Sequence, residues 1–169
     1  YEGIDLGNGQ EGLITYMRTD STRLSDVFMN QAKDLIEDKY GKKYLGSYHA
    51  KNDEGAQDAH EAIRPTTLNN DPELIKNHLT NEQYRLYKLI YARALASQMA
   101  ASTSNSLTIT FSRNGHDMIA NGKTMTFDGF LAVYKDYDSS KDTILPELKL
   151  KEILDQKNLK KKKKFTEPP

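Results

Sequence analysis

The chain has 169 residues, of which 37% are hydrophobic. A chain of this length forms one domain or two small ones, and its low apolar content predicts modest cores with much exposed surface. The formal net charge is zero, so no overall basic excess marks the chain as a nucleic-acid binder. The absence of cysteine excludes disulfides and thiolate metal sites, and no apolar run approaches the ~20 residues of a membrane span.

Residues 1–12 are rich in glycine and predict a flexible lead-in. The run from Gly7 to Gly12 matches the pattern G-x-G-x-x-G. In dinucleotide-binding proteins that pattern follows a strand and opens a helix. Here no convincing strand precedes it and strand-like residues follow it, so a nucleotide site is not predicted.

The next stretch, Gly12 to Ser21, combines a tyrosine, a cation and small polar side chains in the order GLITYMRTDS. Tyr16 and Arg18 are two residues apart, so in an extended segment both side chains leave the same face. The phenol has a pKa near ~10 and is almost fully protonated at neutral pH. A neighbouring guanidinium favours the phenolate and offers a planar fork to a phosphate. The pair therefore suits phosphate chemistry, although a tyrosine in a short strand is more often a core residue.

A helix is predicted from Ser25 or Asp26 to about Tyr40. Either residue can cap it, and apolar residues recur through it at helical spacing. Gly41 is the expected stop because glycine adopts the backbone conformation that ends many helices. The polar residues 42–56 predict a loop.

A short helix is expected over Gln57 to Ile63. It ends there because a residue that precedes proline, here Arg64 before Pro65, disfavours helical geometry. In that arrangement Arg64 lies at a helix end, free to face a groove, and shares a helix face with His60.

Two more helices are predicted from their caps. Asp71 followed by Pro72 starts the first of them. Thr80 and Gln83 form a capping box for the second, which reaches about Met99. The apolar side of the first is expected to hold Leu74, Ile75, His78 and Leu79. The stripe on the second is interpreted as core rather than as a base-stacking surface, and consists of Tyr84, Tyr87, Ile90, Tyr91, Ala94, Leu95 and Met99.

Beyond residue 102 the apolar period changes from helical to alternating. Leu107, Ile109 and Phe111 alternate with polar residues, which predicts a half-buried strand. Asn114-Gly115 is a strong hairpin signal. Further strand is expected at Asp117–Ala120, Thr124–Phe127, Phe130–Tyr134 and Leu148–Ile153. The predicted fold class is therefore α+β, with a mainly helical domain at 1–102 and a β-rich part at 103–169.

Two charged motifs have both a functional and a structural interpretation. Asp136 and Asp138 are spaced like carboxylates of some Mg²⁺ sites, but a solvated loop is favoured because no third ligand is nearby. From Lys149 to Pro169 the chain holds eight Lys against three acidic residues, including the run Lys160 to Lys164. That run is either an exposed charged edge or a nonspecific phosphate contact, and the sequence does not decide between them.

Two motifs together resemble one enzyme family. The run GLITYMRTDST, Gly12 to Thr22, resembles the nucleophile segment of type IA DNA topoisomerases, most closely bacterial topoisomerase I. The run HEAIRPT, His60 to Thr66, resembles that family's other signature in the same domain, in the expected order and at about the expected distance. The resemblance continues to about Met99 and more loosely beyond, and covers a middle portion of the enzyme.

The resemblance implies roles for residues in both motifs. Tyr16 is implied to attack a backbone phosphorus of single-stranded DNA, giving a 5′-phosphotyrosyl bond and a 3′-hydroxyl that later reseals the strand. Arg18 is implied to bind the scissile phosphate and stabilise transition-state charge, and His60 to lie near the same phosphate. Weaker candidates for DNA contact or local support are Thr19, Ser21 and Arg64.

The resemblance also implies partners. The complete enzyme is expected to relax negative supercoils without ATP, and to bind Mg²⁺ through an acidic cluster in an N-terminal domain outside these residues. The chain starts at Tyr1 without Met and ends at Pro168-Pro169, and is interpreted as an excised piece of a multidomain toroidal enzyme. We expect it to bind no metal and to relax no DNA alone. Its expected partners are single-stranded DNA and the rest of the enzyme, in the bacterial cytoplasm at the nucleoid.

Two alternatives remain open at this stage. A noncatalytic single-stranded DNA-binding or interaction module could retain the motifs as scaffold, but would form no DNA adduct on Tyr16. A phosphoesterase that uses His60 would need no tyrosine.

Overall fold

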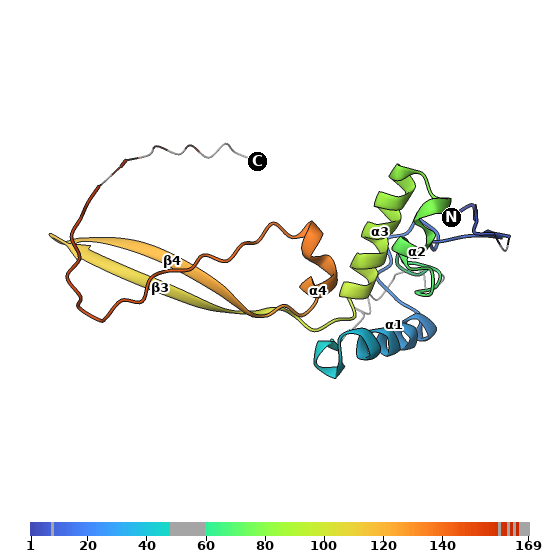
Figure 1. The fold of residues 1–169 in the computed structure, drawn as a ribbon, viewed down its shortest axis with the longest axis horizontal. Coiled ribbons are helices and arrows are strands. Elements are labelled where there is room, and N and C mark those ends of the chain that lie inside the picture. Colours follow the sequence, from blue (N-terminus) through green and yellow to red (C-terminus); the bar gives the residue numbers. More distant parts are fainter. Residues whose placement is uncertain (8, 48–59, 159, 162, 164, 166–169) are drawn as a thin grey trace.

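The structure, a computed structural model, describes residues 1–7, 9–47, 60–158, 160, 161, 163 and 165. It consists of a helical body, formed by helices α1 to α4 and the loops between them, and a long two-stranded ribbon that extends from one side of it (Figure 1). The fold class is α+β, as predicted. None of the helices in these ranges has the length and apolarity needed to cross a membrane.

The main helices begin at the predicted caps. In α1 (Asp26–Lys39) the Ser25 hydroxyl accepts a hydrogen bond from the Phe28 N–H. In α2 (Pro72–Ile75) the Asp71 carboxylate accepts one from the Glu73 N–H. In α3 (Asn81–Ala96) both hydrogen bonds of the predicted capping box are present. Short 3₁₀ turns follow α1 and α2, at Lys42–Tyr44 and Lys76–His78.

The core lies between α1, α3 and the loop before α2. Most of the predicted α3 stripe lies in this core, but Tyr84 and Ile90 are only half-buried and lie outside it. Two tyrosines of the stripe use their hydroxyls inside the core. Tyr87 donates to the Asn70 carbonyl at 2.7 Å and Tyr91 to the Leu68 carbonyl at 2.9 Å, and burial raises the pKa of both phenols. The buried core residues include Phe28, Ile36, Leu68, Tyr87, Tyr91, Leu95 and Met99.

The expected apolar side of the Asp71 helix is partly wrong. Ile75 is buried, but Leu74 is 75% exposed and His78 is exposed. Leu74 lies beside Ile75 within the single turn of α2 and so points to a different side, and His78 ends the 3₁₀ turn that follows. Leu79 packs against the core, as predicted.

The glycine-rich start is not an unstructured lead-in, which corrects the expectation. It forms a small antiparallel pair, β1 (Ile4–Asp5) with β2 (Gln10–Glu11). Gly7 and Gly9 have φ of 93° and 116° in the turn between them, a conformation that glycine adopts without steric cost.

The ribbon pairs β3 (Thr103–Arg113) with β4 (His116–Phe127) around the predicted Asn114-Gly115 turn. Both turn residues have positive φ, as a two-residue hairpin turn requires. The second strand is continuous, where two separate strands were predicted. Leu107 is 51% exposed, so this part of the expected half-buried face is wrong. The ribbon projects from the helical body (Figure 1), and the segment after α4 contacts it at Gly122 through Leu145.

Two other expected strands are absent from the described residues. Phe130–Tyr134 lies in a helical turn, α4 (Leu131–Tyr134), because the chain turns at Gly129 and packs against α3. Leu148–Ile153 forms no strand, and Leu150 is 94% exposed. The segment after α4 pairs with β4 only at the single bridge between Lys123 and Thr143. The division at residue 102 stays a prediction, although α4 returns to the helical body.

The ribbon joins the body through a compact joint. The Tyr44 hydroxyl donates to the Asp128 carboxylate at 2.7 Å, which raises the pKa of the Tyr44 phenol. The Tyr44 ring lies 4.8 Å from the ring of Phe127. Gly129 has φ of 52°, and a Cβ placed there would lie 2.4 Å from the Ala100 carbonyl oxygen. This close approach permits only glycine.

We expect Gly129→Ala to lower the free energy of unfolding by roughly 2–5 kcal/mol, from positive-φ strain plus a steric clash with backbone. Gly115→Ala is the matched control, because Gly115 also has positive φ but nothing lies within 4 Å of its Cβ position. It should cost only about 1–2 kcal/mol. Urea unfolding of both variants measures the difference, and equal losses would contradict the clash at the joint.

Candidate active site

The two sequence motifs lie against each other as neighbouring strands. Ile14 forms an antiparallel bridge with Pro65. The Thr15 N–H donates to the Arg64 carbonyl at 2.9 Å, and the Thr66 N–H donates to the Leu13 carbonyl at 3.0 Å. The segment that carries the tyrosine is therefore fixed by backbone hydrogen bonds to the HEAIRPT segment.

This pairing explains why the helix expected before Pro65 is absent over residues 60–63. The Ala62 N–H donates to the Arg23 carbonyl at 2.8 Å, and the Ala62 carbonyl accepts from the Thr15 hydroxyl at 2.7 Å. Backbone groups used across the chain in this way are not available to a helix. The earlier part of that prediction, 57–59, lies outside the described residues.

Tyr16 follows directly after the paired residues, and its side chain is 38% exposed. Its ring lies 5.7 Å from the His60 ring at an interplanar angle of 30°. On another side, the Tyr1 ring meets it edge-on at 5.4 Å. Within the part of the chain that the structure describes, the Tyr16 hydroxyl makes no hydrogen bond. The phenol ring is held by these two ring contacts, while the side chain as a whole is partly exposed.

Arg18 lies on the exposed loop after Tyr16. The backbone bends at Met17 and Arg18, so the extended geometry assumed for the Tyr16–Arg18 pair ends at the tyrosine. Among the described residues Arg18 takes part in no ion pair. Arg18, two residues after Tyr16, is therefore exposed and has no carboxylate partner in the described ranges.

Thr19 and Ser21 shape the rest of this loop. The Thr19 hydroxyl accepts from the Ser21 N–H at 3.1 Å, and the Ser21 hydroxyl accepts from the Arg23 N–H at 3.2 Å. These side-chain-to-backbone bonds are turns of the kind that Ser and Thr favour. Both residues are half-buried, so local support is one role that the geometry gives them.

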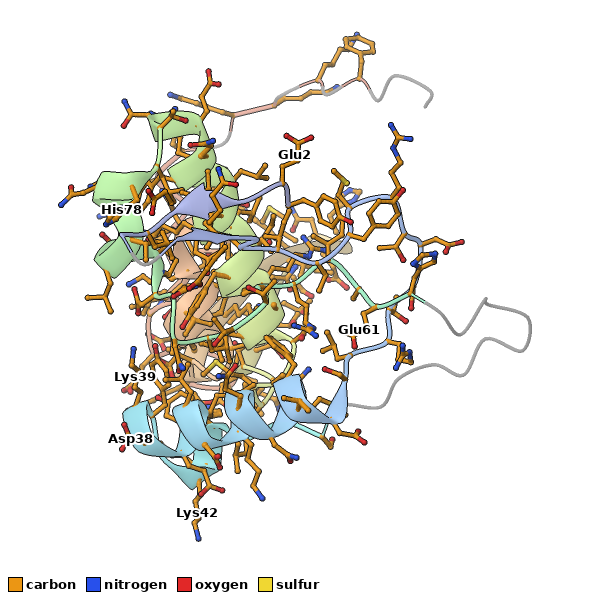
Figure 2. All side chains as sticks on the ribbon, turned by 90° about the vertical axis from the view of Figure 1, so that its right-hand side faces the viewer. Glu2, Asp38, Lys39, Lys42, Glu61 and His78 are labelled. Carbon is orange, nitrogen blue, oxygen red and sulfur yellow. The ribbon has the colours of Figure 1, made fainter. Side chains whose placement is uncertain are left out.

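The expectation that Arg64 is free to face a groove is wrong. Its side chain is only 12% exposed. The guanidinium forms an ion pair with Glu61, with 2.5 Å between Nη2 and Oε2. Figure 2 labels Glu61 between the start of α1 and the loop that carries the tyrosine, on the opposite side of the helical body from His78.

No three His, Asp or Glu side chains of the described residues lie close enough together to hold a metal ion. Hydrogen bonds from the Ser140 side chain and from the Ser140 N–H, the latter at 2.6 Å, lower the pKa of Asp138 and hold it in a loop. Of the five-lysine run, Lys162 and Lys164 lie outside the described residues, and Lys160, Lys161 and Lys163 are exposed. The described residues therefore bring no such set of ligands together, and the absence of a metal from this chain stays a prediction.

The DNA topoisomerase family model matches residues 1–169. The chain belongs to the bacterial type IA DNA topoisomerases. It is similar to full-length topoisomerase I from Thermotoga maritima, with a TM-score of 0.74 and 34% sequence identity. The match covers 88% of this chain and 23% of that one. The family resemblance drawn from the two motifs is thereby confirmed, for a chain that spans about a quarter of this topoisomerase relative.

The structure adds two groups of residues to the site that the sequence did not reveal. Tyr1 contacts Tyr16 from a part of the chain that no motif connects to it. Ser25 and Glu61 hold the Arg64 side chain. The opposite charges of Glu61 and Arg64, three residues apart, are the sequence signal that could have indicated their ion pair, whereas no signal pointed to Ser25.

Proposed function

We propose that this topoisomerase chain carries the nucleophile that cleaves and reseals single-stranded DNA. The Tyr16 oxygen attacks a backbone phosphorus and forms a 5′-phosphotyrosyl bond, while the bond from phosphorus to the 3′ oxygen breaks and that oxygen leaves as a hydroxyl. Resealing is the reverse attack of the 3′-hydroxyl on the phosphotyrosine. The phosphodiester energy is retained in the covalent bond, so the cycle needs no ATP.

The observation that carries this proposal is the partly exposed Tyr16 side chain, whose ring lies beside the His60 ring on two motif segments joined by backbone hydrogen bonds. A nucleophile must be both exposed to its substrate and held in position. The ring contacts with Tyr1 and His60 and the backbone bonds of Thr15 meet the second need. The partial exposure of Tyr16 meets the first.

The neighbouring side chains have proposed roles of their own. Arg18 binds the scissile phosphate and stabilises the negative charge that grows on it in the transition state. His60 lies near the same phosphate. Thr19 and Ser21 form the loop that carries Arg18 and contact the DNA backbone. Negatively charged phosphate attracts this part of the chain because Arg18 has no competing carboxylate among the described residues.

We further propose that these residues act as one part of a larger active site. In the complete enzyme Mg²⁺ is bound by acidic residues of another domain, and relaxation of negative supercoils requires that domain. The cleavage steps above use only this chain's own side chains. Because relaxation requires the other domain, the chain alone is expected to relax no DNA.

The test is to map the covalent DNA adduct. The complete enzyme is incubated with a labelled single-stranded oligonucleotide, denatured and digested, and the DNA-linked peptide is identified by mass spectrometry. We expect the link on Tyr16. Residues 1–169 alone are assayed in parallel on supercoiled DNA and should leave it unrelaxed. DNA binding without any adduct would favour the noncatalytic module, and relaxation by residues 1–169 would refute the divided site.

A further inference from the structure

We propose that Arg64 is a positioning residue for cleavage, which holds the neighbours of both Tyr16 and His60, and that it does not contact DNA. This inference rests on the proposed function. It assigns to one residue, whose side chain is only 12% exposed, the task of keeping the nucleophile and the histidine in register.

The guanidinium is surrounded by acceptors of this chain. Its Nε donates to the Glu61 carboxylate at 2.7 Å, and its Nη2 donates to the Ser25 hydroxyl at 3.2 Å. Its Nη1 donates to the carbonyls of Pro65, at 2.8 Å, and Thr66, at 3.4 Å. The central guanidinium carbon, Cζ, also lies 4.9 Å from the ring centre of Phe28 in the core. All three nitrogens of the fork are thus engaged within the protein.

This arrangement does not suit a phosphate contact. The charge of Arg64 is neutralised by Glu61 at 2.5 Å, and a phosphate would have to displace that carboxylate and meet its repulsion. An arginine with 12% of its side chain exposed offers little surface to a ligand. Breaking a largely buried ion pair is costly because it leaves an uncompensated charge.

Backbone and side-chain contacts together connect Arg64 to both proposed catalytic residues, because its side chain anchors the segment whose backbone pairs with Thr15. Its backbone carbonyl accepts from the Thr15 N–H, and its own N–H donates to the Thr15 hydroxyl at 3.0 Å, so it fixes the residue before Tyr16. Its side chain fixes Glu61, the residue after His60. Its bond to Ser25 ties both to the N-terminal cap of α1. One residue therefore holds the tyrosine and the histidine relative to the helical body.

The expected effect of losing this side chain is on rate and not on binding. A displacement of about 1 Å in a reacting group lowers a rate on the order of 10²-fold. We expect Arg64→Lys, which keeps the charge but lacks the fork, to lower the cleavage rate at saturating oligonucleotide by roughly 10- to 100-fold. The affinity for single-stranded DNA and its salt dependence should remain unchanged. A residue that contacts phosphate would instead contribute roughly 0.7 to the slope of log affinity against log salt.

The experiment uses the complete enzyme with Arg64→Lys and Arg64→Gln, and with Arg85→Gln as a control on the exposed side of α3. Single-turnover cleavage, oligonucleotide affinity at several salt concentrations and thermal unfolding are measured for each. If the Arg64 variants do not fold, Glu61→Gln takes their place, because it keeps the shape of the partner side chain but removes its charge. It separates an effect on the cleavage rate from an effect on DNA affinity in the same way. We expect a slower rate in the Arg64 and Glu61 variants, with unchanged salt slope, and no change in the control.

Two results would overturn the inference. A shallower salt slope in the Arg64 variants would make Arg64 a direct DNA contact. An unchanged rate in the folded variants would leave it with a structural role only. Either result is separate from a failure of the proposed function, which would appear as an adduct that does not depend on Tyr16.

Discussion

Tyr16→Phe in the complete enzyme is expected to abolish DNA cleavage while single-stranded DNA binding and folding stay nearly unchanged. The substitution removes one oxygen. That oxygen makes no hydrogen bond within the described residues, so no internal bond is lost. The ring contacts with Tyr1 and His60 do not need the hydroxyl and are retained.

The measurement is the amount of covalent DNA on a denaturing gel, with oligonucleotide affinity and thermal unfolding determined on the same preparations. Tyr84→Phe is a matched control, because its hydroxyl is also near the surface but donates to Glu73 and lies on α3. That variant should cleave at the rate of the wild type. Recovery of covalent DNA from Tyr16→Phe would show that another residue is the nucleophile.

Local signals in the sequence predicted the helices well, since a helix is specified by residues close to one another. Ser25, Asp71 and the pair Thr80 and Gln83 cap helices in the structure as their side-chain chemistry indicates. The same holds for the Asn114-Gly115 turn. Each of these features depends on backbone groups within four residues of the side chain.

The errors arose where the outcome depends on distant parts of the chain. Phe130–Tyr134 has the composition of a strand, but the joint at Ala100 and Gly129 returns it to α3, where a helical turn fits. Leu148–Ile153 also has an apolar pattern, yet a strand needs a partner strand. Among the described residues, the segment after α4 pairs with β4 at Thr143, and no pairing continues to Leu148–Ile153. The preference of a residue for a strand depends largely on how its side chain packs against neighbouring strands, and the local sequence carries no information about those neighbours.

The candidate site divides in the same way. Tyr16 and His60 were found through their motifs, and the structure places their rings together. Arg64 was also in a motif, but its burial could not be predicted. It depends on Ser25, Glu61 and Phe28, which converge only in the folded chain. A motif indicates that a residue matters without separating contact with substrate from support of its neighbours.

Arg18→Ala is expected to lower the cleavage rate by roughly 10²–10³-fold, the scale of removing one preorganised donor that stabilises transition-state charge. Arg18 is suited to this role because it is exposed and has no carboxylate partner in the described part of the chain, so its charge is available to a phosphate. Arg64 differs in both respects, although both arginines belong to motif segments.

The comparison of these two arginines tests the whole arrangement. Rates are measured on a labelled oligonucleotide at saturation, together with the salt dependence of binding. Arg18→Lys should recover only part of the rate, because an ammonium lacks the two-pronged donor geometry. Arg18→Ala should also make the salt slope shallower by roughly 0.7, since a phosphate contact is lost, whereas the Arg64 variants should leave the slope unchanged. Full activity in Arg18→Ala would exclude Arg18 from the chemistry. Equal salt slopes in the Arg18 and Arg64 variants would mean that burial does not distinguish the arginine that binds phosphate from the one that supports the site.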